Sequence, residues 1–219
     1  MAASKSEFAV HSEKTDSGLS ARIWPATTAF SDNVVISYSL KDLKEHEVNP
    51  NVAMHFIQRN IGHMATLALE AGLLIRGGIS VGELYHADGV VVGQALIEAY
   101  ETESQVATYP RIVLAKSAMD FEEANRVKLT HVDSDGLHCL DYLTNVVLRL
   151  TPDSVVNLDM MPWITQLRML ANNEIARFTQ AGDLRRLSKW RWFSERLEKT
   201  VTALSPELIN VVPAKASNS

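Results

Sequence analysis

The chain contains one cysteine, Cys139, so no disulfide can form within it, and such sparse use of cysteine is typical of a reducing compartment. None of its apolar runs approaches the roughly 20 residues that are needed to span a bilayer. The first 18 residues (MAASKSEFAVHSEKTDSG) lack the apolar segment of a signal peptide. Acidic residues outnumber basic ones, 26 to 21, and the net charge of −5 argues against a general nucleic-acid binder. We therefore expect a cytoplasmic protein that binds neither membranes nor nucleic acid.

The chain is long and apolar enough to fill one core, because 46% of its 219 residues are hydrophobic. It shows no internal repeat and no low-complexity segment. We divide it into a loose lead-in over residues 1–24, an α+β domain over 25–150, a helical extension packed on that domain over 151–205, and a flexible tail over 206–219.

Apolar spacing and turn residues predict the elements. Strands are expected at residues 27–39, 73–85, 90–92 and 111–115, and in a hairpin over 129–143. Helices are expected at residues 52–71, 93–107, 119–127, 154–179 (interrupted at Pro162) and 183–204. Asp88 and Gly89 predict a tight hairpin turn, and Gly72 predicts a helix end. This order predicts helices packed on one face of a largely antiparallel sheet.

Asp32 is the acidic residue with the most unusual surroundings. It precedes a β-branched apolar run in the segment FSDNVVIS (residues 30–37), which we expect to be a buried strand. A carboxylate is costly to bury unless a cation, usually a metal ion, lies beside it. The alternative is an aspartate that caps a turn at the end of the strand, and position alone supports both interpretations equally.

Two further segments accompany this one: LIRGGISVG at residues 74–82 and GQALIEAYETE at residues 93–103. Together the three segments resemble class III nucleotidyl cyclases, and most closely the pyrimidine cyclases of the Pycsar antiphage system. The resemblance implies a ferredoxin-like α+β sandwich, an antiparallel sheet with helices, followed by C-terminal helices. It also implies an enzyme that converts UTP or CTP to the 3′,5′-cyclic mononucleotide and diphosphate. Such enzymes work as head-to-tail homodimers with sites at the interface, and their product activates a separate effector.

The resemblance also implies site residues and a cofactor. In this family two aspartates hold two divalent ions, Mn²⁺ or Mg²⁺, over the triphosphate, and the ribose 3′-oxygen attacks the α-phosphate. Asp32 matches the second aspartate and is expected to be the metal-binding and catalytic residue. Substrate contacts are expected from Thr28, Phe30, Ser31 and Arg76.

Two features of the family are missing from this sequence. No strand followed by Asp-x-x-Gly-Phe precedes Asp32, and Asp16 is the only candidate for the first aspartate. Either the true start lies upstream or the protein is a fragment. The Asn and Arg that face the reacting phosphate in purine cyclases align with Ile97 and Glu101, which fits the pyrimidine branch. The alternative function is therefore a catalytically inactive, N-terminally truncated domain that binds nucleotide or a partner.

Arg76 lies on an otherwise apolar strand and precedes Gly77 and Gly78, which let backbone or a ligand approach closely. A buried arginine needs an anion, so we expect either a substrate phosphate or a carboxylate such as Glu98 or Glu103.

The basic helix expected over residues 183–204 contains Trp190 and Trp192, which suggests RNA binding as one interpretation. Docking of the tryptophans on the body of the protein is favoured, because leucines share their face of the helix. His131 has no metal-ligand spacing and is expected to be a surface or packed residue.

Overall fold

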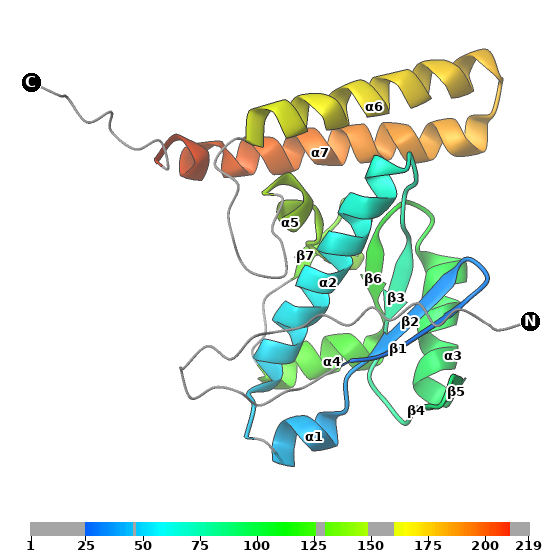
Figure 1. Cartoon of the computed structure of the whole chain (residues 1–219), viewed down its shortest axis with the longest axis vertical. Coiled ribbons are helices and arrows are strands. Elements are labelled where there is room, and N and C mark those ends of the chain that lie inside the picture. The colour runs from blue at the N-terminus through cyan, green and yellow to red at the C-terminus, as the bar shows by residue number, and fades with distance from the viewer. Residues whose placement is uncertain (1–24, 46, 126–129, 149–159, 211–219) are drawn as a thin grey trace, which may run out of the picture.

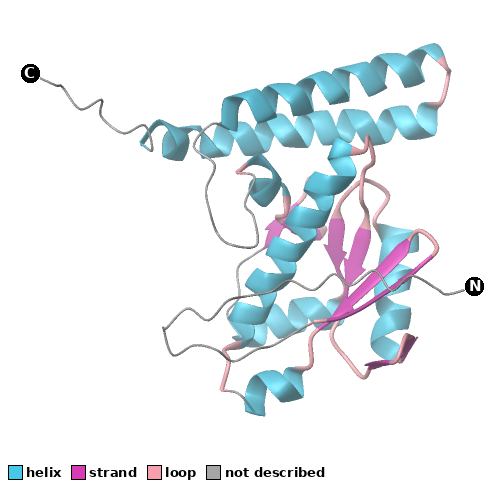
Figure 2. Cartoon of the chain, in the orientation of Figure 1, coloured by secondary structure: helices cyan, strands magenta, loops and turns pink. Residues whose placement is uncertain are grey.

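The computed structural model describes residues 25–45, 47–125, 130–148 and 160–210. Helices and short strands alternate in it, so the mixed α+β class predicted from the sequence is confirmed (Figure 2). No helix within these ranges is both long and apolar enough to cross a membrane. The lead-in over residues 1–24 and the chain after Asn210 lie outside the described residues.

A four-stranded sheet lies at the centre of the fold. Its strands are β3 (Gly77–Ile79), β6 (Ile112–Leu114), β7 (Thr130–Val132) and β8 (His138–Leu140). Their spatial order is β3-β6-β8-β7, with β3 parallel to β6 and the other pairs antiparallel. β6 is buried along its whole length, as the apolar run at residues 112–114 predicts. The sheet is therefore largely antiparallel, as expected, although each of its strands is only 3 residues long.

Helices pack around this sheet and across one end of it. They are α1 (Leu40–Glu45), α2 (Pro50–Glu70), α3 (Gln94–Glu101) with its π-helical continuation η1 (Thr102–Val106), α4 (Lys116–Asn125), α5 (Leu143–Val147), α6 (Met160–Gln180) and α7 (Leu184–Asn210). In Figure 1, α6 and α7 form a long pair that lies over α5 and the end of α2. Val146, Ile164 and Phe193 are completely buried, in one cluster with Leu69 of α2 and Leu114 of β6. The last two helices thus share the core of the sheet.

Helix α2 ends close to where the sequence predicts, and it begins two residues before the expected start at residue 52. The side chain of Asn49 accepts a hydrogen bond from the backbone N–H of Asn51 at 2.9 Å and caps the helix. At the other end Gly72 takes a φ of 72°, the left-handed conformation that commonly ends a helix.

The prolines of α6 and α7 do not end these helices where we expected. Pro162 is the third residue of α6, within the first turn, where a backbone N–H has no helical partner. α6 is therefore not interrupted there, although residues 149–159 before it lie outside the described chain. α7 continues past Pro206 to Asn210, where we expected a flexible tail.

The tryptophans of α7 pack on the body of the protein. Trp190 is 4% exposed and meets Phe193 edge-to-face, with ring centroids 5.7 Å apart. Trp192 stacks on Tyr109, with centroids 5.8 Å apart and an interplanar angle of 5°. The spacing of apolar residues favours packing of these tryptophans on the body of the protein over RNA binding, and the structure shows this packing.

The segment with Asp32 is not the single buried strand that we expected over residues 27–39. It forms a hairpin of β1 (Ala26–Phe30) and β2 (Asn33–Ser37), in which Phe30 pairs with Asn33. Ser31 takes a φ of 57°, the left-handed conformation that a tight two-residue turn uses. Among the described residues the hairpin pairs with no other strand, and Phe30 and Val34 are each 46% exposed. A β-branched run suits such a half-exposed ribbon as well as a buried strand.

The second hairpin is confirmed at the predicted turn. β4 (Tyr85–Ala87) and β5 (Val90–Val92) are joined by Asp88 and Gly89, with φ of 51° and 76°. Positive φ at both positions is the reason for the Asp-Gly preference of this turn. The strand that we expected over residues 73–85 is shorter, because only β3 and Tyr85 of it have ladder partners.

Gly77 and Gly78 are the first two residues of β3. We considered close approach of either backbone or a ligand there, and the structure shows backbone. A Cβ at Gly78 would lie 2.2 Å from the carbonyl oxygen of Ala99 and 3.0 Å from Cβ of Thr102. At Gly77 the nearest atom is Cδ1 of Ile112, the end of a flexible side chain, at 3.0 Å. The backbone of α3 therefore crosses β3 at Gly78.

We predict that Gly78→Ala lowers the free energy of unfolding by about 1–3 kcal/mol, because neither backbone can move aside easily. Gly77→Ala is the matched control and should cost much less, since the side chain of Ile112 can rotate away. Urea unfolding followed by tryptophan fluorescence measures both values. Equal losses in the two variants would contradict the close crossing of α3 over β3.

Candidate functional site

Asp32 lies at the tip of the β1–β2 hairpin and is exposed to solvent. Its Oδ1 accepts a hydrogen bond from Nδ2 of Asn33 at 3.1 Å. The carboxylate needs no buried counter-charge, and our expectation of a buried strand behind Asp32 is wrong, because β1 and β2 are only partly buried. What the hairpin offers is an accessible carboxylate on a defined turn, with the expected substrate residues Phe30 and Ser31 exposed beside it.

His86 of β4 fastens the two hairpins together. Its Nδ1 is 2.8 Å from the hydroxyl oxygen of Ser37, and its Nε2 is 2.9 Å from the hydroxyl oxygen of Thr28. Thr28, which we expected to contact substrate, is thus a hydrogen-bond partner of His86. Sequence reasoning missed His86, although the alternation in a strand places it on the face opposite Tyr85 and Ala87.

Arg76, the remaining expected substrate residue, forms an ion pair with Glu103 of η1. We considered a substrate phosphate and a carboxylate as partners of Arg76, and the structure shows a carboxylate. Glu98, the other candidate, instead accepts a hydrogen bond from the hydroxyl of Ser117 at 2.6 Å. Burial and the nearby charge of Arg76 lower the pKa of Lys189 on α7, so positive charge is concentrated around the pair.

A second polar region surrounds Arg111, just before β6, and nothing in the local sequence marks it. Arg111 is 3% exposed, and its guanidinium donates to Asp133 at 2.8 Å and to Asp135 at 3.0 and 2.5 Å. Arg111 holds the pKa of the Asp135 carboxyl below its usual range. Burial raises the pKa of Asp133, but hydrogen bonds from the Ser134 backbone and from Arg111 outweigh it, and the pKa is lowered.

The outer face of the second hairpin and the helix after it carry exposed apolar side chains. Tyr85, Val90 and Val92 are 55%, 52% and 59% exposed, and Ile97 and Tyr100 of α3 are 51% and 62% exposed. Each is a large side chain that a soluble monomer usually covers when several gather on adjoining elements. Ile97, which we expected to align with a phosphate-facing residue of purine cyclases, is among these exposed side chains.

Metal ligands do not cluster within the described ranges, where no group of three or more His, Cys, Asp or Glu side chains could hold an ion. Asp16, the only candidate for a first metal-binding aspartate, lies outside those ranges. Asp32 thus contributes carboxylate oxygens from one residue, on a turn that leaves them open to solvent.

Comparison with known proteins identifies no relative of this chain. No family model matches it, and no curated protein or solved structure is significantly similar to it. Function is therefore inferred from the residues and from their arrangement.

We predict that His86→Ala frees the first hairpin without unfolding the core. Losing two hydrogen bonds of about 1 kcal/mol each should speed amide hydrogen exchange in β1 and β2 roughly tenfold or more. Exchange in β6 and β8, which His86 does not contact, should stay unchanged. Tyr85→Ala on the opposite face of β4 is the control, and equal effects of the two variants would show that the hydrogen bonds of His86 do not hold the hairpin.

Proposed function

We propose that the protein is a nucleotidyl cyclase of the class III type, related to the Pycsar pyrimidine cyclases. It converts UTP, or CTP, to the 3′,5′-cyclic mononucleotide and diphosphate, and the product acts on a separate effector in antiphage defence. The proposal starts from the three segments around Asp32, Arg76 and Gly93 that resemble this family. The observation that carries it is the position of Asp32, an accessible carboxylate at the tip of a fastened hairpin.

The chemistry of Asp32 fits a divalent ion such as Mn²⁺ or Mg²⁺. Carboxylate oxygens are the donors that these hard ions prefer, and the one side-chain hydrogen bond from Asn33 leaves other lone pairs available. When bound, such an ion supplies positive charge for the triphosphate and lowers the pKa of the attacking ribose hydroxyl. In the family two ions act per site, so further ligands are needed beside Asp32.

The other expected residues have more modest roles in this proposal. Thr28 holds the β1–β2 hairpin in place through its hydrogen bond with His86 and does not contact the base of the nucleotide. Phe30 and Ser31 flank the carboxylate at an exposed tip, where a nucleotide can reach them. Arg76 acts through its ion pair with Glu103, which holds η1 against the strand region before β3.

A homodimer is part of the proposal. The exposed apolar side chains of β4, β5 and α3 are candidates for the surface that a second copy covers. His86 joins the β1–β2 hairpin to the opposite face of β4, and within the described residues the edges of that hairpin pair with no other strand.

The test measures cyclisation of UTP, CTP, ATP and GTP with Mn²⁺ by mass spectrometry. We expect the protein to make a cyclic nucleotide from UTP or CTP and not from ATP or GTP. Asp32→Asn should reduce turnover by roughly 100-fold or more, because it removes the charge of a metal ligand.

Asp88→Asn is the matched control, since Asp88 occupies the turn of the neighbouring hairpin and is equally exposed. It should keep full activity, and both variants should keep the melting temperature of the parent. Full activity in Asp32→Asn would refute the metal assignment. Nucleotide binding without cyclisation would instead support the alternative, a catalytically inactive cyclase-like domain.

A further inference from the structure

The β4–β5 hairpin has one apolar face that is open to solvent. In its register Tyr85 pairs with Val92, and Ala87 pairs with Val90. Because side chains alternate along a strand, these four lie on one side of the hairpin, which we call the ribbon face, and all four are exposed. His86 lies on the opposite side, where it holds the β1–β2 hairpin. That hairpin therefore leaves the ribbon face uncovered.

The surroundings of the ribbon face are acidic. Residues 77–110, which include β4, β5 and α3, contain five Asp or Glu residues and neither Lys nor Arg. Three of the five, Glu83, Asp88 and Glu101, are exposed, and none of them forms an ion pair with a described residue. Glu83 lies two residues before Tyr85, and Asp88 lies in the turn of the hairpin. A surface that covers the ribbon face should therefore combine apolar groups with positive charge.

The start of α7 carries a surface of that kind. Leu184, Ser188 and Arg191 share one side of the helix by their spacing, and all three are exposed. Arg185 lies beside them and is exposed as well, and we call these four residues the α7 patch. Leu184 is 75% exposed, and neither arginine forms an ion pair with a described residue. The patch thus offers an apolar side chain between two unpaired positive charges.

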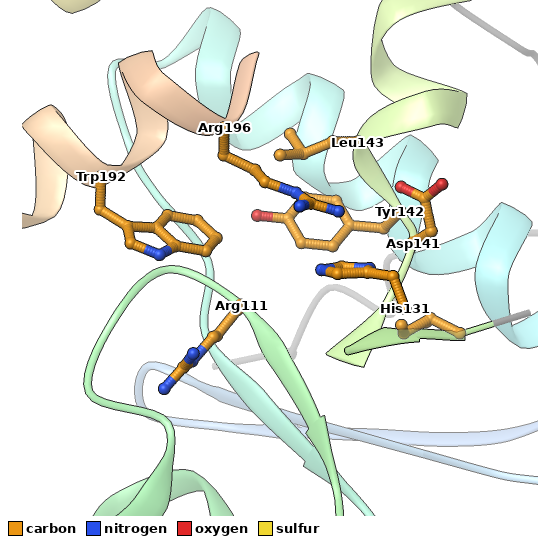
Figure 3. Close-up of a pocket in the computed structure, with 8 residues that line it drawn as sticks. Arg111, His131, Asp141, Tyr142, Leu143, Trp192 and Arg196 are labelled. Carbon is orange, nitrogen blue, oxygen red and sulfur yellow. The ribbon is translucent and has the colours of Figure 1, made fainter. Parts of the chain in front are cut away.

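Farther along α7 the side chains turn inward. Figure 3 shows Trp192 and Arg196 pointing from α7 towards the body of the protein, where they line a small pocket with Arg111, His131 and Tyr142. The two arginines of the α7 patch are exposed instead. They are therefore available to a second molecule.

We propose that the ribbon face of one copy of this chain binds the α7 patch of a second copy. Leu184 and the aliphatic stems of Arg185 and Arg191 cover the apolar side chains of the ribbon face. A guanidinium group can also lie over the ring of Tyr85, and the exposed carboxylates beside the hairpin attract both arginines. Two ribbon faces, or two α7 patches, would bring like charges together, so unlike surfaces pair.

The two surfaces belong to opposite ends of the molecule. In Figure 1, α7 lies across the top, while β4 and β5 lie near the bottom. One chain therefore does not make this contact within itself, and the contact joins different regions of two copies. The proposal goes beyond the homodimer proposed above, because it names the surface that the second copy brings. It rests on charge and burial and does not depend on cyclase activity.

The experiment measures the average mass of the full chain by sedimentation equilibrium, at concentrations up to about 0.5 mM because the surfaces are small. We expect the average mass to rise with concentration. The association constant should fall several-fold between about 0.05 M and about 0.5 M salt, since charge contributes to the contact. A chain that stays monomeric throughout would overturn the proposal and leave the ribbon face to a different partner.

Two variants each remove one surface. Val92→Arg places a positive charge in the ribbon face, and Arg185→Glu combined with Arg191→Glu reverses the charge of the α7 patch. Each should lower the association constant about tenfold or more. All three positions are exposed, so both variants should keep the melting temperature of the parent.

Matched controls change the same kinds of residue elsewhere. Val132→Arg is the control for the ribbon face, because Val132 of β7 is 60% exposed and Val92 is 59% exposed. Lys44→Glu combined with Lys199→Glu alters the net charge as much as the α7 variant does, at exposed positions outside both surfaces. Both controls should associate as the parent does.

Mixing the two test variants separates a specific contact from a general effect of charge. The ribbon-face variant keeps its α7 patch, and the α7 variant keeps its ribbon face, so the mixture should associate more tightly than either variant alone. A mixture that is no tighter than its components, or controls that lose association as the test variants do, would contradict the proposed contact.

Discussion

The buried guanidinium of Arg111 is the interaction on which the arrangement of the sheet and of α7 depends. It is 3% exposed and fixes the β7–β8 turn through Asp133 and Asp135. Its carbonyl accepts the N–H of Gly77 at 3.1 Å, which aligns β3 with β6. Its charge also lies over the ring of Tyr109, which stacks on Trp192 of α7. A buried charge is stable only while it is paired. Removing Arg111, or the aspartates that pair with it, would therefore loosen all of these contacts together.

The hairpins that carry the proposed chemistry lie outside this network. β1–β2 and β4–β5 are separate two-stranded ribbons, and neither is hydrogen-bonded to the four-stranded sheet within the described residues. An isolated hairpin is marginally stable in water, so the two hydrogen bonds of His86 matter more here than they would in a core. The buried sheet and the exposed hairpins are thus separate parts of the fold. The core fixes α3 and β3, while Asp32 lies on a ribbon where it is exposed to solvent.

Local signals in the sequence predicted the elements whose boundaries depend on a few neighbouring residues. The end of α2 at Gly72 and the turn at Asp88 and Gly89 are of this kind, and both are confirmed. The turn at Ser31 and Asp32 was missed because serine is not a typical residue for a positive φ, so one long strand was predicted in its place. The pocket at Arg111, His131 and Arg196 could not be predicted, because its members come from distant parts of the chain and share no spacing. The role of Asp32 as a metal ligand remains a prediction.

The most direct measurement of that role is paramagnetic broadening of backbone amide signals by Mn²⁺ in the presence of UTP. If Asp32 binds the ion, substoichiometric Mn²⁺ should first broaden the signals of Ser31, Asp32 and Asn33, since the relaxation effect falls steeply with distance. The turn at Asp88 should broaden only later, and in Asp32→Asn the early broadening should disappear. Broadening that begins elsewhere, or that persists unchanged in Asp32→Asn, would contradict the assignment of the metal site.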